Sequence, residues 1–388
     1  MSPLTDQRFT IGVEGRALFG AGSIAELPSL LPPISGNRVL LVTDGGVVAA
    51  GIAGEVIALL EAHGFETPLF DGVHPNPSTA TLERGAAAAR WLAPSAVIAL
   101  GGGSVLDAAK GIALLATNDV SPPEIDYRIE PAAPGLPVIA IPTTAGTGSE
   151  TNGFGVFEDP EAHRKFYAGH ASVVPARIIL DPVLTLGLPP PATASTGIDV
   201  LAHALESLSS RRSNPYAQGL NLQVVRMVLR YLPEAVRDGA DLEARAQMLL
   251  AAHMAGLAFA TTGLGLAHAT AHALSAHSGT AHGVGLGILL PHVLAFNLGV
   301  CRDAYEAVAA TVAATGLPLT STSEPHAAVE AAHALVRAVG APLALAEVGV
   351  ASASIDLVVA DALADEVILN TPRLPTSDEL RALLEAAF

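Results

Sequence analysis

The first half of the chain alternates short apolar runs with segments of helical periodicity, and this alternation constrains the fold more than any other feature. The run Arg38–Thr43 has the length of a strand, and Ser95–Leu100 and Leu136–Ile141 are apolar along their whole length. Thr67–Phe70 and Arg177–Leu180 are further strand candidates. Continuous apolar strands between helices are typical of a parallel sheet that helices cover on both faces. We therefore predict an α/β domain with such a sheet.

The second half of the chain has a different pattern. The alternation stops near Asp181-Pro182, and beyond Pro189-Pro190-Pro191 the sequence reads almost entirely as helix. Within it, Asn214-Pro215 has the residue types of an N-cap and a first turn. A length of 388 residues allows two or three domains at roughly 100–200 residues each. We predict an α/β domain over residues 1–181 and an all-helical domain over residues 182–388.

The composition excludes several classes of protein. Asp and Glu number 37 against 20 Lys and Arg, a net charge of −17, which argues against a nucleic-acid partner. The one cysteine, Cys301, excludes an internal disulfide framework and a cysteine-rich metal cluster. The first residues lack the basic region and apolar run of a secretory signal. We expect a cytoplasmic enzyme that acts on a small molecule, with a homodimer as the commonest symmetric state.

One long stretch carries no formal charge and many histidines. Between Arg245 and Arg302 there is no Asp, Glu, Lys or Arg, and Met248–Ala267 would pass a hydropathy test for a membrane span. A lipid-facing span would have to hold imidazoles in hydrocarbon, which is unfavourable. We therefore expect buried helices around a polar site, and no membrane. Six histidines lie in this stretch: His253, His268, His272, His277, His282 and His292. We expect His253, His277 and His292 to be structural, each hydrogen-bonded to backbone.

A glycine-rich loop, Gly101–Ser104, follows the run Ser95–Leu100 and opens the next helix. Glycine lets the backbone turn tightly and approach a ligand, and free N–H groups at a helix N-terminus attract an anion such as pyrophosphate. The loop is not the G-x-G-x-x-G fingerprint of dinucleotide-binding proteins. Its spacing also fits a capping box between Ser104 and Asp107. Phosphate binding and helix capping are both compatible with these residues.

A second loop, Pro142–Glu150, follows the run Leu136–Ile141 and combines glycines with Thr143, Thr144 and Thr147. Small hydroxyls and glycines at the carboxyl edge of a parallel sheet suit hydrogen bonds to phosphate or ribose. An ordinary Thr/Gly-rich turn is the alternative. Two such loops in one sheet favour a nucleotide site.

Asp44 ends the first strong strand. A carboxylate there can accept a hydrogen bond from a ribose 2′-hydroxyl and would repel a 2′-phosphate, which favours NAD over NADP. The alternative is a turn aspartate before Gly45-Gly46.

Carboxylate and imidazole side chains recur at helical spacing in the second half. Asp199 and His203 are four residues apart, as are His268 and His272, so each pair lies on one face of a helix. His282 follows after a short loop. Asp oxygen and His nitrogen are ligands that suit Fe²⁺, Zn²⁺ or similar divalent ions. One such pair is weak support for a metal site, but the density of histidines strengthens it.

These motifs together strongly resemble the iron-containing, or group III, alcohol dehydrogenases. The resemblance runs from Phe19–Gly22 to about Asn297 and becomes weak in the C-terminal helices. The matching segments are Gly101–Lys110 (GGGSxxDxAK in the family), Pro142–Glu150 (PTTxGTGSE), Gly197–Ala204 (GxDALxHA) and Leu266–His272 followed by His282-Gly283 (the paired-histidine signature).

The resemblance implies a dinucleotide-binding α/β domain with a parallel sheet, an all-α domain and a metal in the cleft between them, in a dehydroquinate synthase-like architecture. It implies Fe²⁺, or alternatively Zn²⁺, on the ligands Asp199, His203, His268 and His282. It places His272 near the nicotinamide without binding the metal. Asp44 matches the acidic residue of NAD-preferring members. The implied contacts to the cofactor are Gly101, Gly102, Gly103 and Ser104 in the first loop and Thr143, Thr144 and Thr147 in the second.

The activity that the resemblance implies is reversible hydride transfer between NAD(H) and a small alcohol or aldehyde. The metal acts as a Lewis acid, the cofactor carries the hydride, and His272 is the candidate proton relay. The chain departs from the family pattern at Val200, at Ala281 where many members have proline, and at Thr151–Gly155. Because this last segment is expected to face the substrate, the substrate class does not carry over.

Three alternatives remain open at this point. A maleylacetate reductase, a metal-free relative, usually lacks an aspartate at the position of Asp199. A dehydroquinate-synthase-like lyase would need a basic pocket, for which Lys165 and Arg211-Arg212 are available. A non-catalytic binding or filament-forming protein could have kept the fold.

Overall fold

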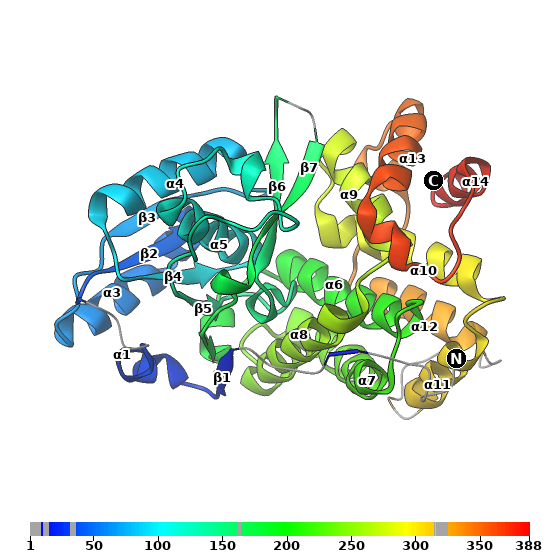
Figure 1. Ribbon diagram of the computed structural model, residues 1–388. Coiled ribbons are helices and arrows are strands. Elements are labelled where there is room, and N and C mark those ends of the chain that lie inside the picture. Colours follow the sequence, from blue (N-terminus) through cyan, green and yellow to red (C-terminus); the bar gives the residue numbers. More distant parts are fainter. Residues whose placement is uncertain (1–8, 11–14, 32–35, 162–163, 314, 316–324) are drawn as a thin grey trace. The chain divides into compact units, whose positions relative to one another are not determined.

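A computed structural model of the chain describes residues 9–10, 15–31, 36–161, 164–313, 315 and 325–388 (Figure 1). The described residues divide into two compact units, one within 13–188 and the other comprising 9–10 with 189–388. The first is α/β and the second is helical, so the predicted fold class is confirmed.

The α/β unit ends at Leu188, seven residues beyond the domain boundary that the sequence predicts after Asp181. Asp181 explains why the next residues stay with the α/β unit. Its carboxylate accepts the N–H groups of Gly22 and Ile24, both at 3.0 Å, and it caps the short helix Pro182–Thr185. That independently folding domains meet at residue 181 stays a prediction.

Six described strands form one sheet in the order β1-β8-β5-β4-β2-β3, and every neighbouring pair is parallel. The central strands β4 and β5 are buried at every residue, whereas the edge strands β1 and β3 are partly exposed. The strands are β1 (Arg16–Phe19), β2 (Val39–Asp44), β3 (Leu69–Val73), β4 (Ala96–Gly101), β5 (Val138–Pro142) and β8 (Arg177–Leu180). The helices of this unit are α1 (Leu27–Leu30), α2 (Gly45–Ala49), α3 (Ile52–Ala62), α4 (Thr79–Leu92) and α5 (Gly103–Thr117).

The sequence predicted the buried strands and, as Thr67–Phe70, part of the edge strand β3, but it missed the other exposed strands. β1 was not predicted, because an edge strand lacks the apolar run that marks a buried one. The antiparallel hairpin of β6 (Phe154–Asp159) and β7 (Arg164–Gly169) was also missed. Its pairs include Glu158 opposite Lys165, so polar residues interrupt the hydrophobic pattern.

The second unit is built from packed helices. The helix α6 contacts α7, α8 and α10, and α9 packs against α13 and α10. These elements are α6 (Pro190–Ser209), α7 (Pro215–Arg237), α8 (Leu242–Thr262), α9 (Leu266–Ser278), α10 (His282–Asn297), α11 (Arg302–Ala313), α12 (His326–Ala338), α13 (Ile355–Ala364) and α14 (Ser377–Ala386).

The uncharged stretch forms α8, α9 and α10, and most of their residues are buried inside this unit. Among the described residues, no single helix has both the length and the apolar character to cross a membrane. The pair α8 and α9 would meet those two criteria together, but the chain bends by 106° at the break between them.

The contact between α6 and α10 depends on Gly283. A Cβ atom at this position would lie 2.1 Å from the carbonyl oxygen of Ser195 on α6, closer than real Cβ contacts allow. Only glycine therefore lets the first turn of α10 approach α6 this closely. The preceding residue, His282, is held beside α6 as a consequence.

We expect Gly283→Ala to lower the free energy of unfolding by about 1–3 kcal/mol, because the added methyl group must push two backbones apart. Urea denaturation measures this. The matched control is Gly219→Ala in α7, where no atom lies within 4 Å of the added Cβ. That change should raise stability by roughly 0.5–1 kcal/mol, because alanine favours the helix over glycine. Equal effects of the two substitutions would contradict the packing argument.

Candidate functional site

The two glycine-rich loops lie side by side in the α/β unit. Gly101 ends β4 and Gly102 is the N-cap of α5, so the first loop links a central strand directly to a helix N-terminus. The second loop begins after the neighbouring strand β5. The two are joined by a hydrogen bond of 3.0 Å from the N–H of Thr143 to the carbonyl oxygen of Gly101. Both loops thus occupy the carboxyl edge of the sheet, where such sheets bind ligands.

Two glycines of the first loop leave room for threonine side chains of the second loop. A Cβ on Gly102 would lie 3.2 Å from the methyl group of Thr144, and one on Gly103 would lie 2.4 Å from that of Thr147. No acidic residue lies in the first turn of α5, where Ser104 lies, and Gly102 offers no side-chain cap. The N–H groups of this turn therefore suit an anion.

Asp107 and Lys110 hold the second loop to α5, a role that the sequence did not reveal. The predicted capping box between Ser104 and Asp107 is wrong, because α5 starts at Gly103 and has Gly102 as its N-cap. Asp107 instead accepts the Ser149 hydroxyl at 2.5 Å and the Val156 N–H at 3.0 Å.

The Lys110 ammonium group is completely buried. It donates to the hydroxyl and carbonyl oxygens of Ser149, both at 2.6 Å, to Asn152 Oδ1 at 3.2 Å and to the Phe154 carbonyl at 2.8 Å. Burial lowers the pKa of Lys110 to about 8, against the opposing charge of Asp107. Asn152 and Phe154 belong to the segment that departs from the family pattern, so part of that segment is engaged in this network.

Asp44 is the N-cap of α2. Its Oδ1 atom accepts the N–H of Gly46 at 2.7 Å and that of Val47 at 3.0 Å. The turn role that we considered as the alternative is therefore present. A carboxylate has a second oxygen, so capping and ribose binding are compatible.

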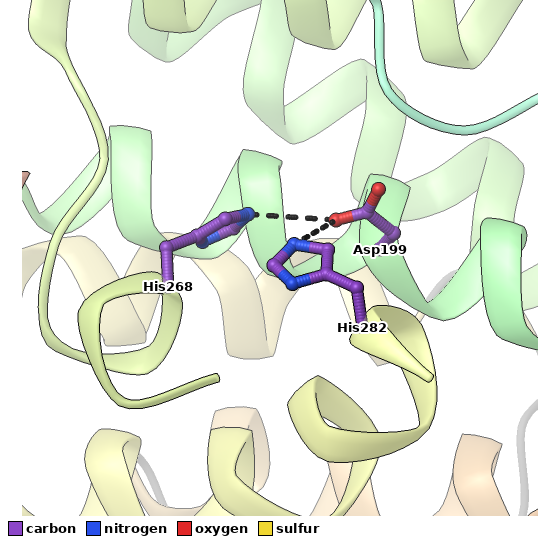
Figure 2. A group of neighbouring side chains, drawn as sticks. All are labelled: Asp199, His268 and His282. Atoms are coloured by element: carbon purple, nitrogen blue, oxygen red, sulfur yellow. Dashed lines mark ion pairs between the residues drawn. The ribbon is translucent and has the colours of Figure 1, made fainter. Parts of the chain in front are cut away.

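In the helical unit, three imidazoles surround one carboxylate oxygen. The Oδ1 atom of Asp199 lies 3.3 Å from Nε2 of His203, 3.4 Å from Nε2 of His268 and 3.7 Å from Nε2 of His282. Figure 2 shows the imidazoles of His268 and His282 turned toward this oxygen. Asp199 and His203 come from α6, His268 from α9 and His282 from the start of α10.

These distances fit ligands that share one ion. Nitrogen and oxygen ligands at 2.0–2.2 Å from a tetrahedral ion lie about 3.3–3.6 Å apart. Neither Asp199 Oδ1 nor His268 Nε2 has a hydrogen-bond partner among the described residues, although both are buried. Ligand atoms of Asp199, His268 and His282 all lie within 4.8 Å of one another. The donor set therefore suits a divalent transition-metal ion.

The pKa values of this cluster reflect its burial and its charges. Burial acts to raise the pKa of Asp199, but the imidazoles of His203, His282 and His268 outweigh it and hold that pKa well below its usual value. Burial lowers the pKa of His203 to about 4. Burial also acts to lower the pKa of His268, but the neighbouring carboxylates of Asp199 and Glu206 outweigh it and raise this pKa to about 9.

Comparison with known proteins identifies the family. The family model described as iron-containing alcohol dehydrogenase matches residues 15–182. The model for the C-terminal part of the same family matches residues 193–388. The chain belongs to the iron-containing alcohol dehydrogenases.

Individual relatives cover nearly the whole chain. Alcohol dehydrogenase 4 of Schizosaccharomyces pombe is 35% identical over 374 residues, 96% of this chain and 87% of that protein. An NAD-dependent methanol dehydrogenase of Bacillus methanolicus is 30% identical over 96% of this chain and 98% of its own length. The crystal structure of a 1,3-propanediol oxidoreductase superimposes with a TM-score of 0.91 at 32% identity, covering 98% of this chain and all of that one.

In this iron-containing alcohol dehydrogenase, His272 lies beside the cluster and pairs with a carboxylate from elsewhere in the helical unit. Its ring stacks on that of His282, with centroids 5.2 Å apart. Its Nδ1 atom lies 2.8 Å from Oδ2 of Asp365, which follows α13. One turn further along α9, Nε2 of His277 lies 2.7 Å from Oδ2 of Asp361, a side-chain partner where we expected backbone.

Two carboxylates that contact the candidate site residues His268 and His272 were missed in the sequence. Glu206 contacts His268, and Asp365 contacts His272. Glu206 had a local signal, since it follows Asp199 and His203 at helical spacing. Asp365 had none, because it lies 93 positions away from its partner.

We expect His268 and His203 to stabilise the metal-free protein most near pH 6.5. The raised pKa of His268, about 9 against 6.5, contributes stability that is complete below pH 6.5 and lost as the pH rises through 9. The lowered pKa of His203, about 4, contributes stability that is lost as the pH falls through 4. Urea unfolding in the presence of chelator, across this pH range, measures both effects.

The control for the alkaline side is His268→Gln, which removes the titrating group. The fall in stability between pH 6.5 and 9 should be much shallower in this variant than in the parent protein. A fall of parental size in His268→Gln would show that other groups cause it.

Proposed function

We propose that this iron-containing alcohol dehydrogenase is a metal-dependent oxidoreductase that transfers hydride reversibly between NAD(H) and a small alcohol or aldehyde. The observation that carries the proposal is the ring of three imidazole nitrogens around one oxygen of Asp199, at 3.3–3.7 Å. The Bacillus methanolicus relative is an NAD-dependent methanol dehydrogenase, which supports both the cofactor and the substrate class.

The proposed metal ligands are Asp199, His203, His268 and His282. The family name favours Fe²⁺, and Zn²⁺ suits the same nitrogen and oxygen donors. A divalent ion bound there would supply Lewis acidity toward the substrate oxygen. The residues themselves exclude water, since the side chains of Asp199, His203 and His268 are each at most 5% exposed. His282 is 30% exposed and leaves one side accessible.

The proposed cofactor site is the pair of loops in the α/β unit. We assign the pyrophosphate to the N-terminus of α5, and we assign the second carboxylate oxygen of Asp44 to the adenosine ribose. The Lys110 network supports this role because it holds the end of the second loop against α5, the helix that the first loop opens. The cofactor contacts are Gly101, Gly102, Gly103, Ser104, Thr143, Thr144 and Thr147.

We assign His272 as the proton relay. Asp365 accepts a hydrogen bond from Nδ1 at 2.8 Å, which fixes the tautomer and orientation of the ring, and we assign the proton exchange with the substrate hydroxyl to Nε2. The side chains of His272 and Asp365 are 14% and 13% exposed, so both reach solvent, as a proton relay requires.

We further propose that the enzyme is a homodimer and lies in the cytoplasm. A two-fold symmetric dimer is the commonest oligomer, and the acidic composition fits a freely diffusing enzyme. The maleylacetate reductase alternative is less favoured, because the aspartate that those enzymes usually lack is present here among three imidazoles.

The test is NADH oxidation with a panel of small aldehydes, using protein stripped of metal and then supplied with Fe²⁺ or Zn²⁺. We expect stripped protein to be inactive, because the ion supplies the Lewis acidity toward the substrate oxygen, and we expect one of the two ions to restore turnover. Full activity in the stripped protein would contradict the proposal and favour catalysis of the maleylacetate reductase type.

We expect His272→Ala to lower kcat by about 10²-fold or more, because a positioned acid–base group contributes typically 10²–10⁴-fold. The KM for NADH and the bound metal should be unchanged. The matched control, His277→Ala, removes a histidine from the same helix that also pairs with an aspartate but lies farther along α9. Its kcat should stay within twofold of the parent value. Equal losses in both variants would argue against the relay.

A further inference from the structure

Glu206 continues the row of side chains that starts with Asp199 and His203 on α6. The three residues are separated by four and three positions, so they lie on one face of this helix. The Glu206 side chain is only 4% exposed. A buried carboxylate is unfavourable unless it is paired and hydrogen-bonded, so its partners must explain its presence.

The partners of Glu206 come from the start of α9. The carboxylate accepts the N–H of Ala267 at 2.6 Å and that of Gly265 at 3.2 Å. Gly265 is the N-cap of α9 and has no side chain to cap the helix. Glu206 therefore performs the capping from a different helix, and its negative charge lies at the positive end of the α9 dipole.

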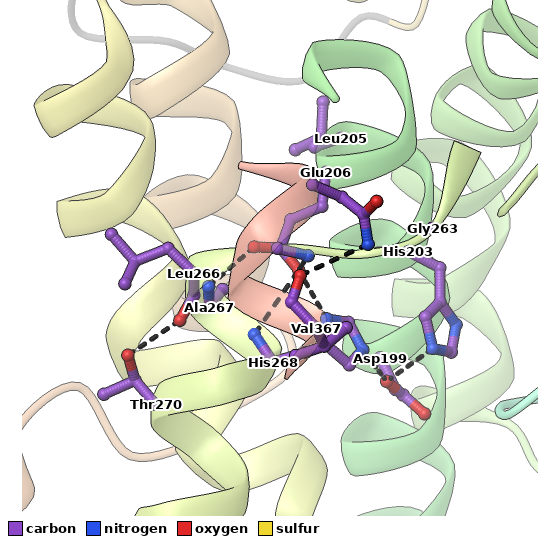
Figure 3. A network of polar contacts seen from close by, with 12 residues as sticks. Asp199, His203, Leu205, Glu206, Gly263, Leu266, Ala267, His268, Thr270 and Val367 are labelled. Atoms are coloured by element: carbon purple, nitrogen blue, oxygen red, sulfur yellow. Dashed lines mark hydrogen bonds and ion pairs between the residues drawn. The ribbon is translucent and has the colours of Figure 1, made fainter. Parts of the chain in front are cut away.

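The same carboxylate also contacts the imidazole of His268. Its Oε2 atom lies 2.5 Å from Nδ1, while Nε2 of the same ring lies 3.4 Å from Asp199 Oδ1 (Figure 3). A carboxylate only accepts hydrogen bonds, so Nδ1 must carry the proton. The lone pair of the neutral ring is then on Nε2, the atom that faces the proposed metal position.

We propose that Glu206 is a positioning residue for the metal: it fixes His268 in the Nδ1–H tautomer and aims Nε2 at the ion. The inference rests on the proposed function in one respect, that His268 is a metal ligand. A carboxylate behind a ligating imidazole fixes its tautomer and orientation and makes it a better donor. Glu206 and Asp199 also supply two negative charges, which match the charge of a divalent cation.

The test is the Zn²⁺ affinity of Glu206→Gln, measured by competition with a chromophoric chelator, together with the visible spectrum of the Co²⁺-loaded protein. Glutamine keeps the size of the side chain and can still accept the N–H of Ala267. Its amide can donate to Nδ1, which favours the Nε2–H tautomer and blocks the ligand atom. We expect Zn²⁺ to bind about 10–100-fold more weakly and the Co²⁺ bands to shift.

The matched control is Asp181→Asn in the α/β unit. Asp181 is completely buried and, like Glu206, accepts backbone N–H groups, those of Gly22, Ile24 and Val183. Its loss should lower stability without changing Zn²⁺ affinity. Zn²⁺ affinity of Glu206→Gln within threefold of the parent value, with an unchanged Co²⁺ spectrum, would overturn the proposal.

Two further variants separate a failure of the proposed metal site from a failure of the proposed role of Glu206. His268→Ala tests the ligand assignment alone: parental Zn²⁺ affinity in this variant would refute the proposed metal site, whatever Glu206→Gln shows. Glu206→Asp serves if the glutamine variant does not fold. It keeps the charge but withdraws the oxygen from Nδ1 by about one bond length, so Zn²⁺ should bind several-fold more weakly, and parental affinity would overturn the proposal.

Discussion

The neutralisation of two buried carboxylates on α6 determines how the helical unit packs. Removing a carboxylate from water costs several kcal/mol unless close partners compensate. For Asp199 the partners are three imidazoles, and for Glu206 they are the N-terminus of α9 and the Nδ1 atom of His268. Because all of these partners except His203 come from α9 and α10, both helices must begin next to α6.

Two glycines make this approach possible. A side chain at Gly283 would collide with the backbone of Ser195, and one at Gly265 would lie 3.3 Å from Glu206 Oε1. Gly265, just before α9, and Gly283, in the first turn of α10, thus let the helix N-terminus and the imidazoles come close to the carboxylates on α6. The arrangement leaves Asp199 Oδ1 and His268 Nε2 without hydrogen-bond partners among the described residues, which is the feature that a cation would satisfy.

In the α/β unit a buried positive charge, the ammonium group of Lys110, also holds separate segments together. Lys110 is surrounded by oxygen acceptors of Ser149, Asn152 and Phe154, and Asp107 binds the same serine. These bonds attach the second glycine-rich loop and the start of β6 to α5. The aspartate and lysine of the first motif therefore hold the second loop in place, and the backbone N–H groups at the start of α5 remain suited to an anion.

The sequence by itself determined the features that follow from short-range periodicity. Continuous apolar runs identified the central strands, and the spacing of Asp199 and His203 placed both side chains on one helix face, because helix and strand geometry repeat every few residues. Tertiary structure alone decided which groups meet across long separations: Glu206 with His268, Asp365 with His272, and Lys110 with the second loop. Local pattern carries no information about such partners, since they are selected by the requirement that every buried charge finds its complement in the folded chain.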